Sequence, residues 1–223
     1  MRREGRITPA QTEALQRLWP RFGIDEGDGA LEPAALFGRR APLVVEIGFG
    51  AGHHLLASAQ ARSFDIDWDK DDKVFLPWLT RPLAEAKAAG DIDKLDLPNL
   101  RVLCQDAVQV LRQRLPAGAA DEVVIFFPDP WPKKRHHKRR LIQPEFARVL
   151  AHTLRPGGRL RLATDWADYA RHMLEVLEAE PAFANLAGPG NAMPRPDDRP
   201  LTRFEARGLR LGHAVADFEY RRV

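Results

Sequence analysis

Residues 123–140 place a single carboxylate next to a dense run of cations. The apolar residues 123–127 lead to Asp129, which stands between Pro128 and Pro130, and residues 133–140 then hold six Lys or Arg and two His. The apolar part is typical of a buried strand, and the proline-flanked part is typical of a loop at its carboxyl end. Ligands of open α/β sheets bind at the carboxyl ends of strands. The pattern therefore predicts a catalytic acid beside a polyanion such as a nucleic acid.

A second candidate site follows the apolar residues 43–47, where a glycine turn has the spacing G-x-G-x-G over residues 48–52. Glycines let a backbone pass close to a ligand, as in the dinucleotide fingerprint G-x-G-x-x-G. Here Glu46 stands two residues before the first glycine, and a carboxylate disfavours a diphosphate. It suits a cationic or hydroxyl-rich ligand, such as the amino-acid and ribose parts of S-adenosylmethionine. A tight turn without a ligand is the alternative.

Two further acids follow predicted strands. Asp106 comes just after residues 100–104, where it either caps the next helix or contacts a ligand, and the glycine turn favours the ligand. Asp165 follows residues 160–164, and either Thr164 or Asp165 could cap the helix after it. Acids at several strand ends are consistent with one shared site.

The cationic residues 133–140 can each contact a phosphate and release a counterion, although a solvated face is the commonest explanation of a charge run. Trp131 either stacks on a base or belongs to the core. His136 and His137 could bind a metal ion, but no third ligand has matching spacing, so we expect no metal. The mixed residues 202–205 permit contact with a base edge.

Bulk properties set weaker limits. The chain has 223 residues, a net charge of +3, a pI near 9.2 and one cysteine, Cys104, which excludes an internal disulfide. No apolar run approaches the roughly 20 residues that span a bilayer, and no secretory signal is visible, so we expect a cytoplasmic protein without membrane contact. Residues 65–76 resemble a calcium loop but carry Lys70 and Leu76 where an EF-hand needs Gly and Glu.

The order of the elements predicts an α/β fold. Strands over residues 43–47, 100–104, 123–127 and 160–164 alternate with helices, which indicates βαβ units and a mostly parallel sheet. The tail, residues 214–223, could add an antiparallel strand. Residues 1–40 are interpreted as an N-terminal arm, ordered or flexible, and residues 41–223 as a single domain. Residues 188–200 are too rich in Pro and Gly for a helix and predict a long loop, either functional or flexible.

Taken together, four segments resemble the bacterial tRNA (guanine-N7)-methyltransferase family. They are the glycine turn after Glu46, the Pro-Asp-Pro-Trp element with its cationic residues, the segment 163–166, and Thr202-Arg203-Phe204-Glu205. The resemblance implies a Rossmann-like class I methyltransferase with a doubly wound, mostly parallel sheet. It also implies transfer of a methyl group from S-adenosylmethionine to N7 of the variable-loop guanine of tRNA, by a monomer or a homodimer.

The resemblance assigns roles to individual residues. Glu46, Gly48, Gly50, Asp72 and Asp106 would contact the methyl donor, and Asp129 would be the active-site acid where donor and guanine meet. The residues expected to contact the tRNA are Lys133, Arg135, His136, His137, Lys138, Arg139, Arg140, Asp165, Thr202, Arg203, Phe204 and Glu205.

Residues 63–82 depart from the family pattern. The family has an apolar second strand there, ending in an acid that holds the donor's ribose, and then a helix, whereas here Phe64, Ile66 and Trp68 alternate with aspartates. Pro77 and Pro82 interrupt the expected helix. Asp72 is the nearest ribose-binding candidate, with Asp69 behind it. This departure leaves open an RNA-binding protein that has lost catalysis; a nucleotide-dependent dehydrogenase is the third interpretation.

Overall fold

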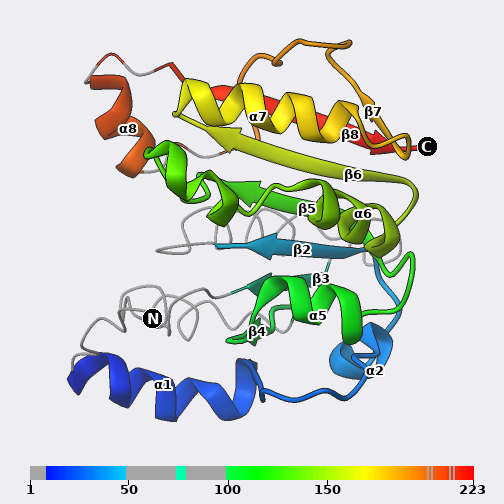
Figure 1. Ribbon diagram of the computed structural model, residues 1–223. Helices are drawn as coiled ribbons and strands as arrows, with labels where there is room; N and C mark the ends of the chain where they lie inside the picture. The colour runs from blue at the N-terminus through cyan, green and yellow to red at the C-terminus, as the bar shows by residue number, and fades with distance from the viewer. Residues whose placement is uncertain are drawn as a thin grey trace.

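The computed structural model describes residues 9–48, 74–78, 99–199, 201, 203–210, 212 and 214–223. In these ranges the chain forms an eight-stranded sheet with the order β1-β4-β3-β2-β5-β6-β8-β7 and helices packed against it (Figure 1). The predicted α/β class with a mostly parallel sheet is confirmed.

The strands are β1 (Gly23–Ile24), β2 (Leu43–Ile47), β3 (Val74–Trp78), β4 (Val102–Leu103), β5 (Ala120–Phe126), β6 (Leu154–Thr164), β7 (Phe183–Asn185) and β8 (Ala216–Arg222). The helices are α1 (Pro9–Phe22), α2 (Pro33–Phe37), α5 (Ala107–Gln113), the 3₁₀ helix η1 (Lys134–Arg139), α6 (Pro144–Thr153), α7 (Ala167–Glu178) and α8 (Arg203–Arg210).

The strand order reverses direction between β2 and β5. From β2 the chain builds outward through β3 and β4 on one side, and from β5 it builds outward through β6 on the other. The pairs β2–β3, β2–β5 and β5–β6 are parallel, while β8 runs antiparallel to β6, as the tail predicts. The carboxyl ends of β2 and β5 therefore lie side by side at the point where open α/β sheets bind ligands.

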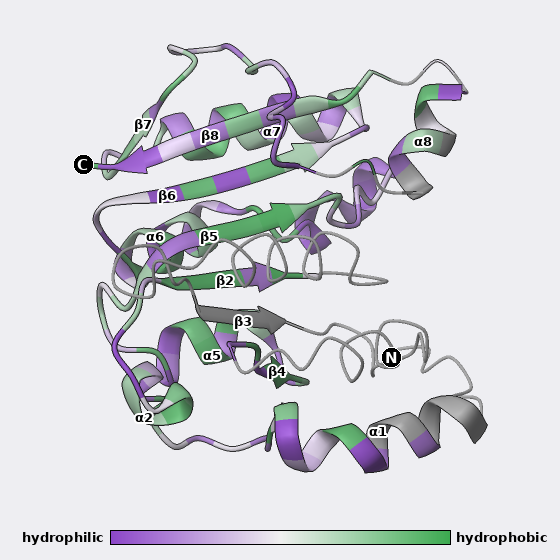
Figure 2. Cartoon of the chain, turned by 180° about the vertical axis from the view of Figure 1, so that it is seen from behind, coloured by the Kyte–Doolittle hydropathy of each residue, from purple (hydrophilic) through white to green (hydrophobic). Residues whose placement is uncertain are grey.

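The apolar character of the central strands follows from their position. All five residues of β2 are buried, including Glu46. In β5, Ala120 and the four consecutive residues 122–125 are buried. An interior parallel strand is typically covered on both faces, which favours apolar side chains on both sides. Figure 2 shows the hydrophobic colour concentrated along β2 and β5.

Helices α5, α6 and α7 lie on the same face of the sheet (Figure 1). On α7 the buried residues are Tyr169, Met173, Val176 and Leu177, which is the predicted helical spacing. At the opposite edge of the molecule α1 lies beside β1. Helix α8 lies at the edge to which the arrowheads of β5 and β6 point (Figure 1).

The N-terminal segment differs from the expected arm. Residues 9–40 hold α1, β1 and α2, and β1 pairs in parallel with β4. Leu18, Phe22, Ile24 and Leu31 are buried. This part of the segment thus extends the sheet and its core.

The second strand also lies at a different position from the one examined in the sequence. Strand β3 occupies Val74–Trp78, between β2 and β4, and so includes Pro77, which was expected to interrupt a helix. The run Val-Phe-Leu-Pro-Trp is apolar at every position, as an interior parallel strand requires. Residues 64–68 lie outside the described residues.

Candidate active site at the carboxyl edge of the sheet

The carboxyl edge of the sheet brings the glycine turn and the Asp129 loop together. Ile47 at the end of β2 is in register with Ile125 of β5, so Gly48 and Phe126 occupy the next level of the sheet. Adjacent strands lie about 4.8 Å apart. Gly48 has a φ of 77°, and a Cβ built on it would meet no atom within 4 Å. Gly48 is the last described residue after β2, and exposed Asp129 follows β5 three residues beyond Phe126.

The loop that carries Asp129 has a strained backbone. Among the described non-glycine residues, those with a positive φ are Phe127 (51°) and Trp131 (46°), which stand two residues before and two residues after Asp129. Such conformations cost roughly 1–3 kcal/mol each and persist where the surroundings impose them. The strain flanks the one residue to which the sequence assigns a chemical role.

Arg140 holds this loop from one side. Its side chain is 2% exposed; its Nε donates to the carbonyl of Pro130 at 2.9 Å, and its Nη2 forms an ion pair with Asp168 of α7. The same Nη2 lies 3.0 Å from Nε2 of His137. The Arg140 bond lowers the pKa of Asp168, whose carboxylate therefore stays charged and keeps the arginine in place. The first turn of α7 thus positions the loop through one guanidinium.

Tyr169 lies behind Arg140. The guanidinium carbon is 4.9 Å from the centroid of the tyrosine ring, and the Tyr169 hydroxyl accepts a hydrogen bond from the backbone N–H of Ile142 at 3.1 Å. Burial raises the pKa of Tyr169 to about 12, and the negative charge of Asp129 contributes to the rise. Asp129 is therefore close enough to the start of α7 for its charge to affect the pKa of Tyr169.

The cationic residues form η1 rather than an irregular loop. The side chains of Lys133, Lys134, Arg135, Lys138 and Arg139 are exposed, and those of His136 and His137 are half-buried. The Arg139 guanidinium carbon lies 5.0 Å from the ring centroid of Trp131, and the His136 ring meets that ring edge-on at 5.9 Å. Trp131 is half-buried and supports η1 on the loop. Five exposed cations thus follow Asp129 directly.

Protonation of His136 is disfavoured. Desolvation and the charges of Arg139, Arg135, Lys133 and Lys138 lower the pKa of His136. An anion placed against η1 would oppose the effect of these charges. The η1 surface is therefore electrostatically suited to a polyanion.

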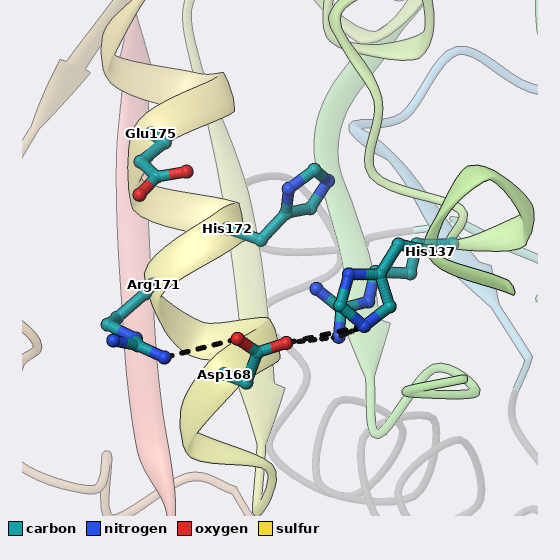
Figure 3. A pocket seen from close by; sticks show the side chains of 6 residues that line it. His137, Asp168, Arg171, His172 and Glu175 are labelled. Carbon is teal, nitrogen blue, oxygen red and sulfur yellow. Dashed lines mark hydrogen bonds and ion pairs between the residues drawn. The ribbon is translucent and has the colours of Figure 1, made fainter. Parts of the chain in front are cut away.

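A polar pocket of about 280 Å³ separates η1 from α7 (Figure 3). Its lining residues are His137, Arg140, Asp168, Arg171, His172 and Glu175. Asp168 stands between Arg171, at 3.1 Å, and His137, at 3.6 Å. Asp168 is thus paired with the surrounding cations, and these ion pairs link η1 to α7.

The donor side of the site is acidic, as the sequence predicts. Glu46 is buried at the end of β2, and Asp106 is half-buried at the start of α5. Oδ1 of Asp106 accepts hydrogen bonds from the N–H groups of Val108 and Gln109 at 3.0 and 3.2 Å, so its capping role is present. Carboxylates near the end of β2 and after β4 can accept hydrogen bonds from the amine and hydroxyl groups of a donor such as S-adenosylmethionine.

At the end of β6 the two candidate caps differ. Oγ1 of Thr164 accepts a hydrogen bond from the N–H of Trp166 at 3.3 Å, while Asp165 is half-buried. Asp165 lies at the carboxyl end of a strand adjacent to β5, on the edge that carries Asp129.

Two residues expected to contact tRNA are engaged inside the protein. Arg140 binds Pro130 and Asp168, and Glu205 is 1% exposed in a bidentate ion pair with Arg199. Both side chains are buried in the structure, and their contact with tRNA stays a prediction. Both hold the loop or its neighbours.

Several predicted residues lie outside the description. Gly50, Asp72 and Thr202 are outside the described residues, and Arg203 and Phe204 belong to α8, with their side chains outside the description. In the chain Asp72 precedes β3, whereas the resemblance places the ribose-binding acid after this strand. Leu79, Thr80 and Arg81 follow β3, so no acid directly succeeds it.

Three positioning residues were not found from the sequence: Asp168, Tyr169 and Arg199. Asp168 carries the weak signal of an acid in the first turn of a helix, and Tyr169 is one of the buried residues of α7. Arg199 lies in the proline-rich segment, where no periodicity marks burial.

Two kinds of feature are absent from the described residues. In the ranges the structure describes, no three His, Cys, Asp or Glu side chains gather as metal ligands. In the same ranges no helix combines the length and apolarity needed to cross a membrane.

Solved structures with a similar fold include rRNA methyltransferases. The 16S rRNA methyltransferase KamB aligns with a TM-score of 0.54 and 18% identity, over 84% of this chain and 91% of that one. The 16S rRNA (adenine(1408)-N(1))-methyltransferase from Catenulisporales acidiphilia, solved with cosubstrate SAM, aligns with a TM-score of 0.52 and 16% identity, over 86% and 92%. At this identity the likeness establishes the class I methyltransferase fold.

Sequence comparison reaches further. Residues 40–218 match a family profile described as "Putative methyltransferase". The tRNA (guanine-N(7)-)-methyltransferase of Leifsonia xyli is 48% identical over 97% of this chain and 92% of its own length, and that of Halorhodospira halophila is 50% identical over 99% and 93%. The chain belongs to the tRNA (guanine-N(7)-)-methyltransferase family.

Proposed function

We propose that this protein transfers a methyl group from S-adenosylmethionine to N7 of the variable-loop guanine of tRNA. The observation that carries the proposal is one juxtaposition at the carboxyl edge of the sheet. The end of β2 with Gly48 lies beside the end of β5, and the strained loop with exposed Asp129 and the exposed cations of η1 follow β5. A tRNA substrate would place the reaction in the cytoplasm.

The donor would be held by the acidic side of this edge. Glu46 and Asp106 are acceptors for amine and hydroxyl groups, and Gly48 leaves room for close approach. S-adenosylmethionine supplies an electrophilic methyl group on a sulfonium. The ribose-binding acid has yet to be identified, since no acid directly follows β3.

Asp129 would orient the guanine and offset its developing charge. N7 carries an in-plane lone pair, so no base has to remove a proton before attack. The protein must align N7 with the methyl group, which is chiefly a proximity effect. Positive charge then spreads over the purine, and a fixed carboxylate stabilises that charge. The strained backbone on both sides of Asp129 holds it for this purpose.

The tRNA backbone would lie against η1. Lys133, Lys134, Arg135, Lys138 and Arg139 offer five exposed cations for phosphates. Trp131 is covered by Arg139 and His136, so its contribution is to support η1. Asp165, on the same edge, and Arg203 at the start of α8 would approach the guanine region.

The test is methyl transfer followed by nucleoside analysis. Purified protein is incubated with labelled donor and a tRNA transcript, and we expect labelled 7-methylguanosine. The matched control is the same tRNA with 7-deazaguanosine, which lacks N7, and it should stay unlabelled. Label in any other nucleoside, or in the control, contradicts the proposal.

Donor binding separates the enzyme from an RNA-binding protein without catalysis. Calorimetry with S-adenosylmethionine should give one site per chain, and Glu46→Gln should weaken it about tenfold through loss of a charge-assisted hydrogen bond. A chain that binds tRNA and shows no heat with the donor would favour the non-catalytic alternative.

A further inference from the structure

A buried cluster of charges lies next to the Asp129 loop. Arg199 is 1% exposed, and its Nη1 and Nη2 donate to the two carboxylate oxygens of Glu205 at 2.6 and 2.7 Å. Its Nε lies 2.7 Å from Oδ1 of Asp217, and its Nη2 donates to Oδ2 at 3.0 Å. One guanidinium thus joins α8, which carries Glu205, to β8, which carries Asp217.

Stability alone is a poor reason for such a cluster. Taking charges out of water costs several kcal/mol per ion, and apolar replacements of similar volume are often neutral or stabilising. Burial raises the pKa of Asp217 despite the opposing charge of Arg199. Arg195 adds a second cation, with its Nε 3.4 Å from Glu205. A group retained at such a cost calls for a role in geometry.

The Arg199 guanidinium also contacts the start of the strained loop. Its central carbon is 5.6 Å from the ring centroid of Phe126 and 5.5 Å from that of Phe127, which are cation–π distances. Phe127 is the residue with a φ of 51° that begins the turn toward Asp129. Its N–H donates to the carbonyl of Ala163 at 2.8 Å, so the backbone is fixed to β6 while the ring is fixed by Arg199.

The proline-rich segment is ordered around this arginine. The N–H of Met193 donates to the carbonyl of Asp217 at 2.9 Å, and Asp198 forms two hydrogen bonds, of 2.9 and 2.6 Å, with Arg161 of β6. Met193 and Asp198 are therefore bonded to β8 and β6 of the sheet. The same segment carries Arg199, whose guanidinium meets the ring of Phe127.

We infer that Arg199 is a positioning residue that couples the start of α8 to the loop that carries Asp129, so that RNA contact at α8 and alignment of the carboxylate depend on one buried guanidinium. The inference rests on the proposed methyl transfer. Lysine cannot replace arginine in this role. It can form neither the bidentate ion pair with Glu205 nor the contact of a planar guanidinium with the ring of Phe127.

The experiment compares methyl transfer per folded molecule. Arg199→Lys, Phe127→Leu and the control Arg222→Lys, at the far end of β8, are assayed in single turnover with saturating donor and tRNA. Melting curves choose a temperature at which each variant is folded, and donor titration counts competent sites. Arg199→Lys should transfer about 10- to 100-fold more slowly, the loss expected from a misplaced reacting group. Its donor affinity should stay within about twofold.

Phe127→Leu keeps the ionic cluster and removes the ring contact, so it should slow transfer in the same direction. Arg222→Lys should transfer at the wild-type rate, because Arg222 bonds the carbonyl of Leu154, remote from the loop. A lower melting temperature with a wild-type rate per folded molecule in Arg199→Lys would make the cluster merely structural and overturn the inference. The proposed function itself fails only if the wild-type chain makes no 7-methylguanosine.

The link to α8 has a separate readout. If Glu205 acts through Arg199, then Arg199→Met with Glu205→Gln should transfer no more slowly than Arg199→Met alone. Losses that multiply in the double variant would show that the two residues act independently and would contradict the coupling.

Discussion

Two sets of cations border the Asp129 loop and share little beyond the sign of their charge. The exposed set, Lys133–Arg139 without its histidines, is solvated. The buried set, Arg140 and Arg199, is at most 3% exposed, and each guanidinium meets a carboxylate and an aromatic ring.

The difference teaches that a charge run is not one functional unit. Exposed cations suit phosphates because water and salt screen them until a polyanion arrives. Buried arginines are already committed to carboxylates, and their planar forks fix geometry. Residue 140 lies only one position beyond Arg139, yet it belongs to the second set. The four predictions that follow test this division.

The largest expected effect comes from removing the exposed set. The quadruple variant Lys134→Ala, Arg135→Ala, Lys138→Ala, Arg139→Ala should lose about 100-fold in tRNA affinity at moderate salt. The slope of log affinity against log salt should become shallower by roughly 3, at about one phosphate contact per cation. Filter binding over a salt series measures both. The free energy of unfolding should change by less than about 1 kcal/mol.

The charge-matched control neutralises four exposed arginines elsewhere, Arg112, Arg148, Arg155 and Arg221. It should leave the salt slope near that of the wild type. An equal loss in both variants would mean that net charge, not η1, attracts the tRNA.

Replacing a buried arginine should act on the fold and on the rate. Arg140→Met removes the bonds to Pro130 and Asp168, and we expect about 2 kcal/mol of lost unfolding free energy, below the usual buried-pair value because Asp168 is 43% exposed. Methyl transfer should slow at least tenfold as the loop loosens. Denaturant titration and single-turnover kinetics measure these effects. A salt slope shallower by about 1, with unchanged stability, would instead return Arg140 to the phosphate-binding set.

Two tyrosine variants test the hydrogen bond between Tyr169 and Ile142, which lies behind Arg140. Tyr169→Phe leaves the buried N–H of Ile142 without its acceptor and should lower the free energy of unfolding by about 1 kcal/mol. Tyr220→Phe is the control, because the buried Tyr220 hydroxyl has no hydrogen-bond partner among the described residues, and its loss should be neutral or stabilising. Equal destabilisation in the two variants would show that the Ile142 bond contributes nothing specific.

The smallest effect is a pH dependence at His136. The pKa of His136 is lowered in the free protein by desolvation and by neighbouring cations, so tRNA phosphates should raise it again and binding should take up a proton. Affinity should therefore increase as the pH falls from about 7.5 to about 5.5, by about threefold more in the wild type than in His136→Asn. Identical pH profiles would remove His136 from the interface.

The sequence predicted the parts of the site that chain order alone specifies. Asp129, Gly48 and Asp106 follow strands that periodicity identifies, and parallel strands bring their carboxyl ends to one edge. The same logic placed β8 and the helical face of α7. Local pattern was sufficient there because each residue's role depends on its own element.

Long-range pairing was the part that pattern could not supply. Arg140 and Glu205 looked like surface charges because their partners, Asp168 and Arg199, are far away in sequence or hidden in a proline-rich segment. Strand β3 was missed because the second strand was sought at residues 64–68 and Pro77 was assigned to the helix after it, although five apolar residues in a row satisfy the environment between β2 and β4. Tertiary context outweighed local preference in each case.

The most direct measurement is single-turnover methyl transfer by Asp129→Asn, which keeps the shape of the side chain and removes its charge. With saturating donor and tRNA we expect at least about a 100-fold slower rate, with the affinities for donor and for tRNA within about twofold of the wild type. A wild-type rate in this variant would show that the Asp129 carboxylate does not stabilise the guanine as it is methylated.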